Sequence, residues 1–172
     1  MCMRVTLLVF VAAAFSLRAV KEEKLPEFTG TTAQAWINSP PLRVADLRGK
    51  VVLLEVWAFG CGNCQRSIPW LKAVQRKFPV EALAVVGIHT PEFDSEKNRA
   101  NVEKNMRRLS ITFPVMIDND YAYWNCLQNR YWPTFYLADK AGKIRGVYIG
   151  ETHTGDSQAQ AMEQQIAELM SR

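Results

Sequence analysis

The segment WAFGCGNCQRSIPWL, residues 57–71, decides the fold of this 172-residue chain. It follows VVLLEVW, residues 51–57, a largely apolar run rich in valine that is typical of a central strand buried on both faces. Apolar side chains then recur every three or four positions over residues 64–78, which predicts a helix. Pro69 lies inside this helix and is expected to kink it. The segment therefore joins a buried strand to a helix through a short turn that carries two cysteines.

Cys61 and Cys64 stand at the start of the predicted helix, with two residues between them. The first N–H groups of a helix lack partners and carry partial positive charge, which stabilises a nearby thiolate. The pKa of such a cysteine thiol falls below the value of about 8.5 for a free cysteine. We expect Cys61, at the cap, to be exposed and nucleophilic, and Cys64 to be less exposed and to close a disulfide with it. The pattern predicts thiol–disulfide exchange through a mixed disulfide.

Other interpretations of the cysteine pair stay open. A purely structural disulfide in so short a ring constrains little of the unfolded chain. The pair could be half of a zinc site, but the sequence has no second CxxC to complete it. The two histidines, His89 and His153, are far apart in sequence. A copper- or zinc-binding, metallochaperone-like module would use both cysteines and His89. A peroxiredoxin-like peroxidase is disfavoured, because the four residues before Cys61 carry no hydroxyl to hold peroxide.

Alternating strand and helix signals cover the rest of the chain. Residues 33–37 and 42–44 flank a turn and predict an N-terminal β-hairpin. Further strands are predicted at 82–88, 115–117, 134–137 and 144–149, and further helices at 94–109, at 120–127 and from residue 156 or 157 onward. This order predicts an α/β fold with a mixed central β-sheet and helices on both faces.

The cysteine segment resembles the active-site segment of thioredoxin-fold proteins. Glu55 stands two residues before the tryptophan, the CxxC follows, and Pro69 lies eight residues after the first cysteine. Downstream, residues 131–134 (YWPT) resemble the family's loop in which a cis-proline faces the disulfide. The resemblance implies that the Trp132–Pro133 bond is cis.

Three further segments resemble one branch of that superfamily, the TlpA/ResA-like proteins, and specifically the thioredoxin-like domain of DipZ-type proteins. They are GIHTPEF at 87–93, FPVMIDND at 113–120 and NRYWPTFYL at 129–137. The resemblance implies a thioredoxin fold with a TlpA-like αβ insertion near residues 94–117, and an exported or membrane-associated thiol–disulfide oxidoreductase. DipZ-type proteins also carry a membrane-embedded electron-carrying domain, which this chain lacks, so we expect a separate membrane electron donor. Ser67 stands where ResA-like members often have a glutamate.

Roles are expected for individual residues. Cys61 is expected to attack the substrate disulfide, and Cys64 is expected to resolve the mixed disulfide. We expect this pair to be the redox-active group of the protein, with no other cofactor and no metal. Glu55 is expected to be a buried carboxylate with a raised pKa that accepts the Cys64 proton. Pro133 is expected to hold a backbone edge open for an extended substrate. The predicted substrate-binding residues are Trp57, Gly62, Asn63, Trp132, Pro133 and Thr134.

Three other features carry expectations. The dipeptide Gly62-Asn63 has neither the proline of thioredoxin nor the histidine of strong oxidants, so it leaves the redox direction open, and a reductant is the working hypothesis. Cys126 is expected to be a small buried helix residue. His89 is expected to be a satisfied structural histidine, with a proton or metal role as the alternative.

The N-terminus predicts export. Arg4 precedes an uncharged run at residues 5–17, about 20 Å long as a helix, whereas a bilayer core needs roughly 30 Å. We expect a signal peptide at 1–19 and a thioredoxin-like domain at 20–172, with an uncleaved membrane anchor as the alternative. Export predicts a periplasmic or other extracytoplasmic site and disulfide-containing exported proteins as partners. The net charge of +4 is scattered and gives no ground for a nucleic-acid partner.

Overall fold

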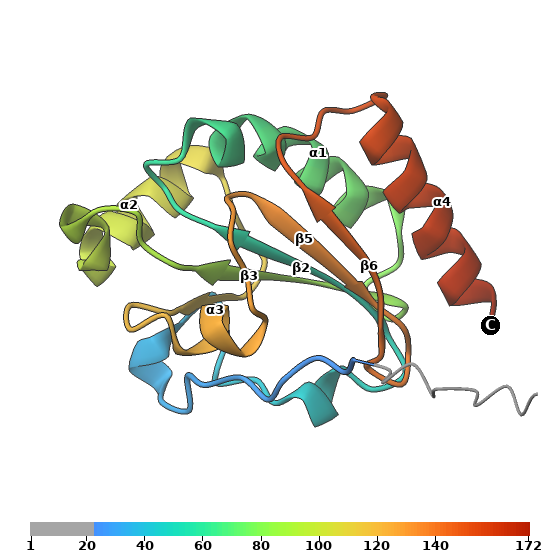
Figure 1. Cartoon of the computed structure of the whole chain (residues 1–172), viewed down its shortest axis with the longest axis horizontal. Coiled ribbons are helices and arrows are strands. Elements are labelled where there is room, and N and C mark those ends of the chain that lie inside the picture. The colour runs from blue at the N-terminus through green and yellow to red at the C-terminus, as the bar shows by residue number, and fades with distance from the viewer. Residues whose placement is uncertain (1–22) are drawn as a thin grey trace, which may run out of the picture.

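A six-stranded mixed sheet forms the centre of the computed structural model, which describes residues 23–172 (Figure 1). The predicted signal peptide at 1–19 lies outside the described residues. The strand order is β1-β4-β3-β2-β5-β6. The bounds are β1 Trp36–Ile37, β2 Val51–Trp57, β3 Leu83–His89, β4 Val115–Ile117, β5 Thr134–Ala138 and β6 Ile144–Ile149. The strands β2, β3 and β4 run parallel, whereas β5 is antiparallel to both β2 and β6.

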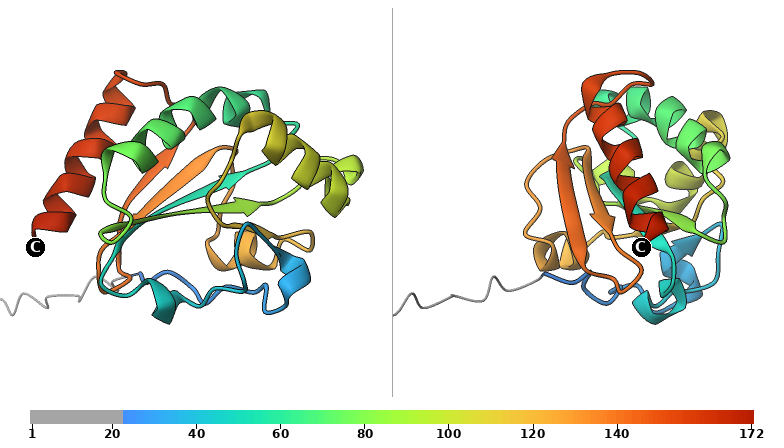
Figure 2. Two further views of the ribbon diagram at one scale, coloured as in Figure 1. Left: turned by 180° about the vertical axis from the view of Figure 1, so that it is seen from behind. Right: turned by 90° about the vertical axis from the view of Figure 1, so that its right-hand side faces the viewer.

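Helices cover both faces of this sheet, as predicted (Figures 1 and 2). One face is covered by α1 (Gly62–Lys77), α2 (Arg99–Leu109) and α4 (Ser157–Ser171). The other is covered by α3 (Ala122–Cys126) and the N-terminal segment from residue 23. Each face of the sheet has its own hydrophobic core. Strand β2 contributes side chains to both cores, because successive side chains of a strand point to opposite faces. Leu53 packs with the α1 side and Leu54 with the α3 side.

The helix predicted at 94–109 is interrupted. Asp94–Lys97 forms a short 3-10 helix, η3, and α2 then starts at Arg99. The break comes at Asn98, whose side chain accepts hydrogen bonds from the N–H groups of Ala100 and Asn101 and so caps α2. Together, α2 and β4 form the predicted αβ insertion after β3. Helix α4 is capped by Asp156, as one of the two predicted positions.

The predicted N-terminal β-hairpin is wrong. Strand β1 pairs antiparallel with β4, with Trp36 opposite Met116, while the second predicted arm enters a 3-10 helix at Val44–Leu47. The turn between them is tied to the insertion instead of closing on itself. Asn38, at a φ of 66°, donates from its side chain to the carbonyls of Ile111 and Phe113 at 3.0 and 3.1 Å.

Within residues 23–172, none of the helices has the length and apolar character needed to cross a bilayer.

Candidate active site

The two cysteines lie where β2 gives way to α1. Cys61 is the N-cap residue of α1 and is joined to Cys64 by a disulfide, with 5.3 Å between the Cα atoms. The Cys61 sulfur accepts a hydrogen bond from the Cys64 N–H at 3.2 Å, so it occupies the positive end of the helix. Cys61 is 7% exposed, whereas Cys64 is fully buried. The prediction that Cys61 is exposed is therefore wrong, although Cys61 is the member of the pair that keeps some accessible surface.

Side chains from three elements hold the turn before Cys61. The Phe59 N–H donates to Nε2 of His89, on β3, at 3.2 Å, and the Phe59 carbonyl accepts from the Gln65 amide, on α1, at 2.5 Å. The Gly60 N–H donates to the Glu96 carboxylate, on η3. Each of these backbone groups thus has a fixed partner, which orders the turn that presents the nucleophile.

Glu55 is completely buried within β2. Alternation along the strand places it on the face of Leu53 and Trp57, which belong to the same core as Ile68 of α1. Neither carboxylate oxygen has a hydrogen-bond partner among residues 23–172. Burial alone raises the pKa of Glu55 from 4.5 to about 8. The prediction of a buried carboxyl that titrates near neutrality is consistent with this environment.

His89 packs in the core, but the expectation that both its ring nitrogens are satisfied is wrong, because Nδ1 is buried without a hydrogen-bond partner among residues 23–172. It is fully buried, and burial lowers its pKa to about 4, which keeps the ring neutral near pH 7. Its ring stacks on Phe59 with 5.6 Å between centroids and packs edge-on against Trp57. Its Nε2 is taken by the Phe59 N–H. Within residues 23–172, no three His, Cys, Asp or Glu side chains gather in a way that could hold a metal, so the structure does not assemble the copper alternative.

The Trp132–Pro133 bond is cis, which confirms the prediction made from the resemblance. The Trp132 indole N–H donates to the Thr90 carbonyl at 3.0 Å, and the ring packs on Trp124 with 4.2 Å between centroids. The carbonyl of Pro133 accepts from the Gly150 N–H at 2.9 Å. The backbone N–H and C=O of Trp132 pair with no backbone group of residues 23–172, which leaves both free for an incoming chain.

The predicted substrate-binding residues differ in exposure. Gly62 and Asn63 are exposed on the first turn of α1, and Trp132 is half-buried. Trp57 is fully buried and Thr134 is 1% exposed, so neither side chain offers a surface to a substrate. Trp57 packs in the core, and the Thr134 hydroxyl donates to the Tyr131 carbonyl at 2.8 Å. Pro133 is also buried, so its ring offers no surface to a substrate either.

An ion pair beside the CxxC escaped the sequence analysis. The Arg66 guanidinium donates to both carboxylate oxygens of Glu151 at 2.7 and 2.6 Å, and to the Asn63 side chain at 2.5 Å. Glu151 also contacts His153, with 2.6 Å between Oε1 and Nε2. The spacing of Asn63 and Arg66 on one helix face was a usable signal. The partnership with Glu151 was not, because it joins residues 85 positions apart.

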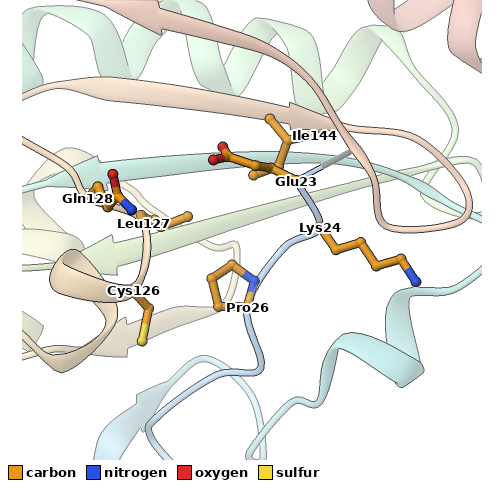
Figure 3. Close-up of a pocket in the computed structure, with 7 residues that line it drawn as sticks. All are labelled: Glu23, Lys24, Pro26, Cys126, Leu127, Gln128 and Ile144. Atoms are coloured by element: carbon orange, nitrogen blue, oxygen red, sulfur yellow. The ribbon is translucent and has the colours of Figure 1, made fainter. Parts of the chain in front are cut away.

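Cys126 is exposed, and the prediction that it is buried is wrong. Helix α3 has five residues, and only Tyr123 of these is buried. Cys126 lines a pocket of about 430 Å³ between α3 and the segment that begins at Glu23 (Figure 3). None of the active-site residues described above lines this pocket.

Comparison with known proteins agrees with this geometry. A family model described as the AhpC/TSA family matches residues 22–147. The chain belongs to the AhpC/TSA family. Its relatives include the protein DipZ of Mycobacterium tuberculosis, 43% identical over 129 residues that cover 73% of this chain and 18% of DipZ. They also include the thiol-disulfide oxidoreductase YkuV of Bacillus subtilis, 27% identical, with 74% of this chain and 84% of YkuV covered. The chain thus spans less than a fifth of DipZ.

Solved structures show the same fold. A thioredoxin-like superfamily protein aligns with a TM-score of 0.75 and 29% identity, covering 87% of this chain and 97% of the other. A thiol-disulfide isomerase from Corynebacterium glutamicum aligns with a TM-score of 0.72 and 24% identity, covering 86% and 97%. These likenesses confirm the predicted thioredoxin fold. The chain thus combines a thioredoxin-like fold and an AhpC/TSA family match with a CxxC disulfide, and one of its relatives, YkuV, is named a thiol-disulfide oxidoreductase.

Proposed function

We propose that this protein reduces disulfide bonds in exported proteins, with Cys61 as the attacking thiolate. The observation that carries the proposal is the asymmetry of the pair: Cys61 keeps 7% of its surface exposed at the helix cap, whereas Cys64 is fully buried. The Cys64 N–H donates to the Cys61 sulfur, which favours negative charge on that atom. The redox-active pair needs no further cofactor.

The exchange runs in two steps. In the reduced protein, the Cys61 thiolate attacks one sulfur of the substrate disulfide, forms a mixed disulfide and releases the first substrate sulfur as a thiolate, which takes a proton from water. The Cys64 thiol then passes its proton to the Glu55 carboxylate and attacks the Cys61 sulfur. This step closes the Cys61–Cys64 disulfide and releases the second substrate thiolate. Two electrons have moved to the substrate, and a separate membrane donor returns them.

A peptide substrate would bind along the backbone of Trp132. The free N–H and C=O of Trp132 support pairing with an extended chain, which is β-augmentation over one residue. The exposed Gly62 and Asn63 flank the attacking sulfur and would contact residues beside the substrate disulfide. The peroxidase alternative finds no support at this turn, because Ala58, Phe59 and Gly60 offer no hydroxyl to a peroxide.

Trapping of the mixed disulfide tests the assignment of roles. In a Cys126→Ser background, which removes the exposed free thiol, Cys64→Ser should accumulate covalent adducts with a reducible protein such as insulin. Cys61→Ser should form none. Adducts of the Cys61→Ser variant would reverse the roles, and failure of the unsubstituted protein to reduce insulin would remove the proposed function.

The apolar run at residues 5–17 supports export, and we propose that the mature protein begins at residue 20. In cells that express the full chain, the protein should accumulate outside the cytoplasm with residues 1–19 removed. Mass spectrometry of the fractionated protein measures this directly. An intact N-terminus in the membrane fraction would support the anchor, and an intact N-terminus in the cytoplasm would contradict export.

A further inference from the structure

A buried carboxylate from the insertion reaches the residue before the nucleophile. Glu96 is the third residue of the short helix η3 and is 1% exposed. One of its oxygens, Oε1, accepts a hydrogen bond from the Gly60 N–H. The other, Oε2, accepts from the N–H groups of Glu92 at 2.5 Å and Phe93 at 3.1 Å. One side chain therefore joins the turn before Cys61 to the segment that follows β3.

The glycine at position 60 makes room for this carboxylate. A Cβ atom built on Gly60 would overlap Oε1 of Glu96. The backbone of Gly60 is outside the left-handed region, so its conformation does not itself require glycine. The absence of a side chain thus serves the approach of Glu96, and the two residues form one contact that a change at either position disturbs.

Loss of this contact would loosen the nucleophile's own turn. Phe59 is held by His89 and Gln65, but the Gly60 N–H has Glu96 as its acceptor. Gly60 is exposed, so without Glu96 its N–H would bond to water, and the turn would lose the side chain that fixes it at this position. Cys61 follows directly, and its sulfur gains from the helix only while it stays at the cap.

We propose that Glu96 is a positioning residue for Cys61: by holding the Gly60 N–H, it fixes the Cys61 sulfur at the N-terminus of α1. The inference rests on the proposed function, in which Cys61 is the attacking thiolate. Glu96 touches no reacting atom, and it acts through Gly60. The insertion thereby contributes a residue that fixes the position of the active-site cysteine.

The test follows the reactivity of Cys61 against pH. In the full chain with Cys2, Cys64 and Cys126 replaced by serine, the rate of alkylation by iodoacetamide reports the thiolate of Cys61 alone. Glu96→Ala should move the midpoint of this pH profile upward, toward the free-thiol value of about 8.5, and slow alkylation at pH 7 about tenfold. The other titratable groups nearby, Glu55 on β2, Arg66 on α1 and His89 on β3, are unchanged in the variant.

Two companion variants separate positioning from general damage. Asp139→Ala is the matched control, because Asp139 accepts from the backbone N–H groups of Ala141 and Lys143 at the opposite end of β5. It should lower stability without moving the midpoint. Gly60→Ala should displace Glu96 and raise the midpoint as Glu96→Ala does. The midpoint of the double variant should be shifted no further than that of the more strongly shifted single variant, because both substitutions break the same contact.

A folded Glu96→Ala protein with an unmoved midpoint would overturn the inference, as would multiplied effects in the double variant. If Glu96→Ala does not fold, Gly60→Ala alone decides, because it leaves the carboxylate in the chain. The alkylation assay uses no protein substrate. Failure to reduce insulin would therefore remove the proposed function while the role of Glu96 is judged separately on the midpoint.

Discussion

Glu55 is buried without a hydrogen-bond partner, so the native protein favours its neutral form while the unfolded chain favours its ionised form. Its pKa is about 8 in the fold against 4.5 as the ordinary value. Between these values the native state binds more protons than the unfolded state, and stability falls as pH rises. The contribution is complete below about pH 4.5 and is lost progressively up to about pH 8.

Glu55→Gln should remove this pH dependence. At pH 7 the buried carboxyl lowers the free energy of unfolding by about 3 kcal/mol relative to acidic pH, at 1.36 kcal/mol for each unit. The stability of the variant minus that of the unsubstituted protein should therefore rise between pH 4.5 and 7.5. Urea unfolding of both oxidised proteins at several pH values measures the difference. A difference that stays constant with pH would show that Glu55 ionises normally in the fold.

Glu55→Gln should also slow the resolving step. A carboxyl with a pKa near the working pH is well suited to take the Cys64 proton, and such assistance contributes about 10²–10⁴-fold. Rapid-mixing kinetics of a Cys61 mixed disulfide should show slow resolution at pH 7 and a smaller effect at pH 9, where the thiol ionises unaided. Glu168→Gln, on the exposed side of α4, is the control and should match the unsubstituted rate. Equal rates at pH 7 would leave Glu55 with a structural role only.

At the scale of elements, Ser67 joins α1 to the loop after β6. Its hydroxyl donates to the Asn63 carbonyl at 2.9 Å and accepts from the buried Thr152 N–H at 3.0 Å. Ser67→Ala leaves the Thr152 N–H buried without an acceptor and should destabilise the protein by about 1–3 kcal/mol. Ser171→Ala, at the exposed end of α4, should change stability by less than about 0.5 kcal/mol. Urea denaturation compares them, and equal stabilities would contradict the bridging role.

The elements that the sequence predicted well are those whose signal is local. The run VVLLEVW is β2 itself, and the helical spacing beyond it is α1. The hairpin failed because β1 pairs with β4, about eighty residues later, and no local turn signal records such a partner. The interruption at Asn98 was missed because its capping side chain lies inside an otherwise helical pattern.

The residues of the candidate site also differ in whether a local sequence signal reveals them. Cys61, Cys64 and Glu55 were found because a motif and a polar residue in an apolar strand are visible in one dimension. Glu96 was missed since its partner, Gly60, lies 36 positions away and the contact exists only in the fold. Cys126 was misplaced because the number of turns in α3, not the residue type, determines which side chains are buried.

At the scale of the whole molecule, folding and reduction belong to one thermodynamic cycle. A fold that stabilises the reduced pair makes a strong oxidant, as in DsbA at about −120 mV, whereas thioredoxin lies at about −270 mV. Here Cys64 is fully buried in the apolar core beneath α1. Burial in apolar surroundings disfavours a thiolate, so the fold does little to stabilise the second sulfur of the reduced pair. The burial of Cys64 therefore favours the oxidised pair.

We expect the oxidised protein to be more stable than the reduced protein, and the reduction potential of the Cys61–Cys64 pair to lie nearer −270 mV than −120 mV. The gap between these values corresponds to about 7 kcal/mol for a two-electron couple, so the two outcomes are well separated. Equilibration with thiol–disulfide buffers at pH 7, followed by alkylation and mass spectrometry, measures the potential. Urea unfolding of the oxidised and reduced forms measures the stabilities independently. A potential near −120 mV, with the reduced form more stable, would make the protein an oxidant of its substrates and reverse the direction of electron flow proposed above.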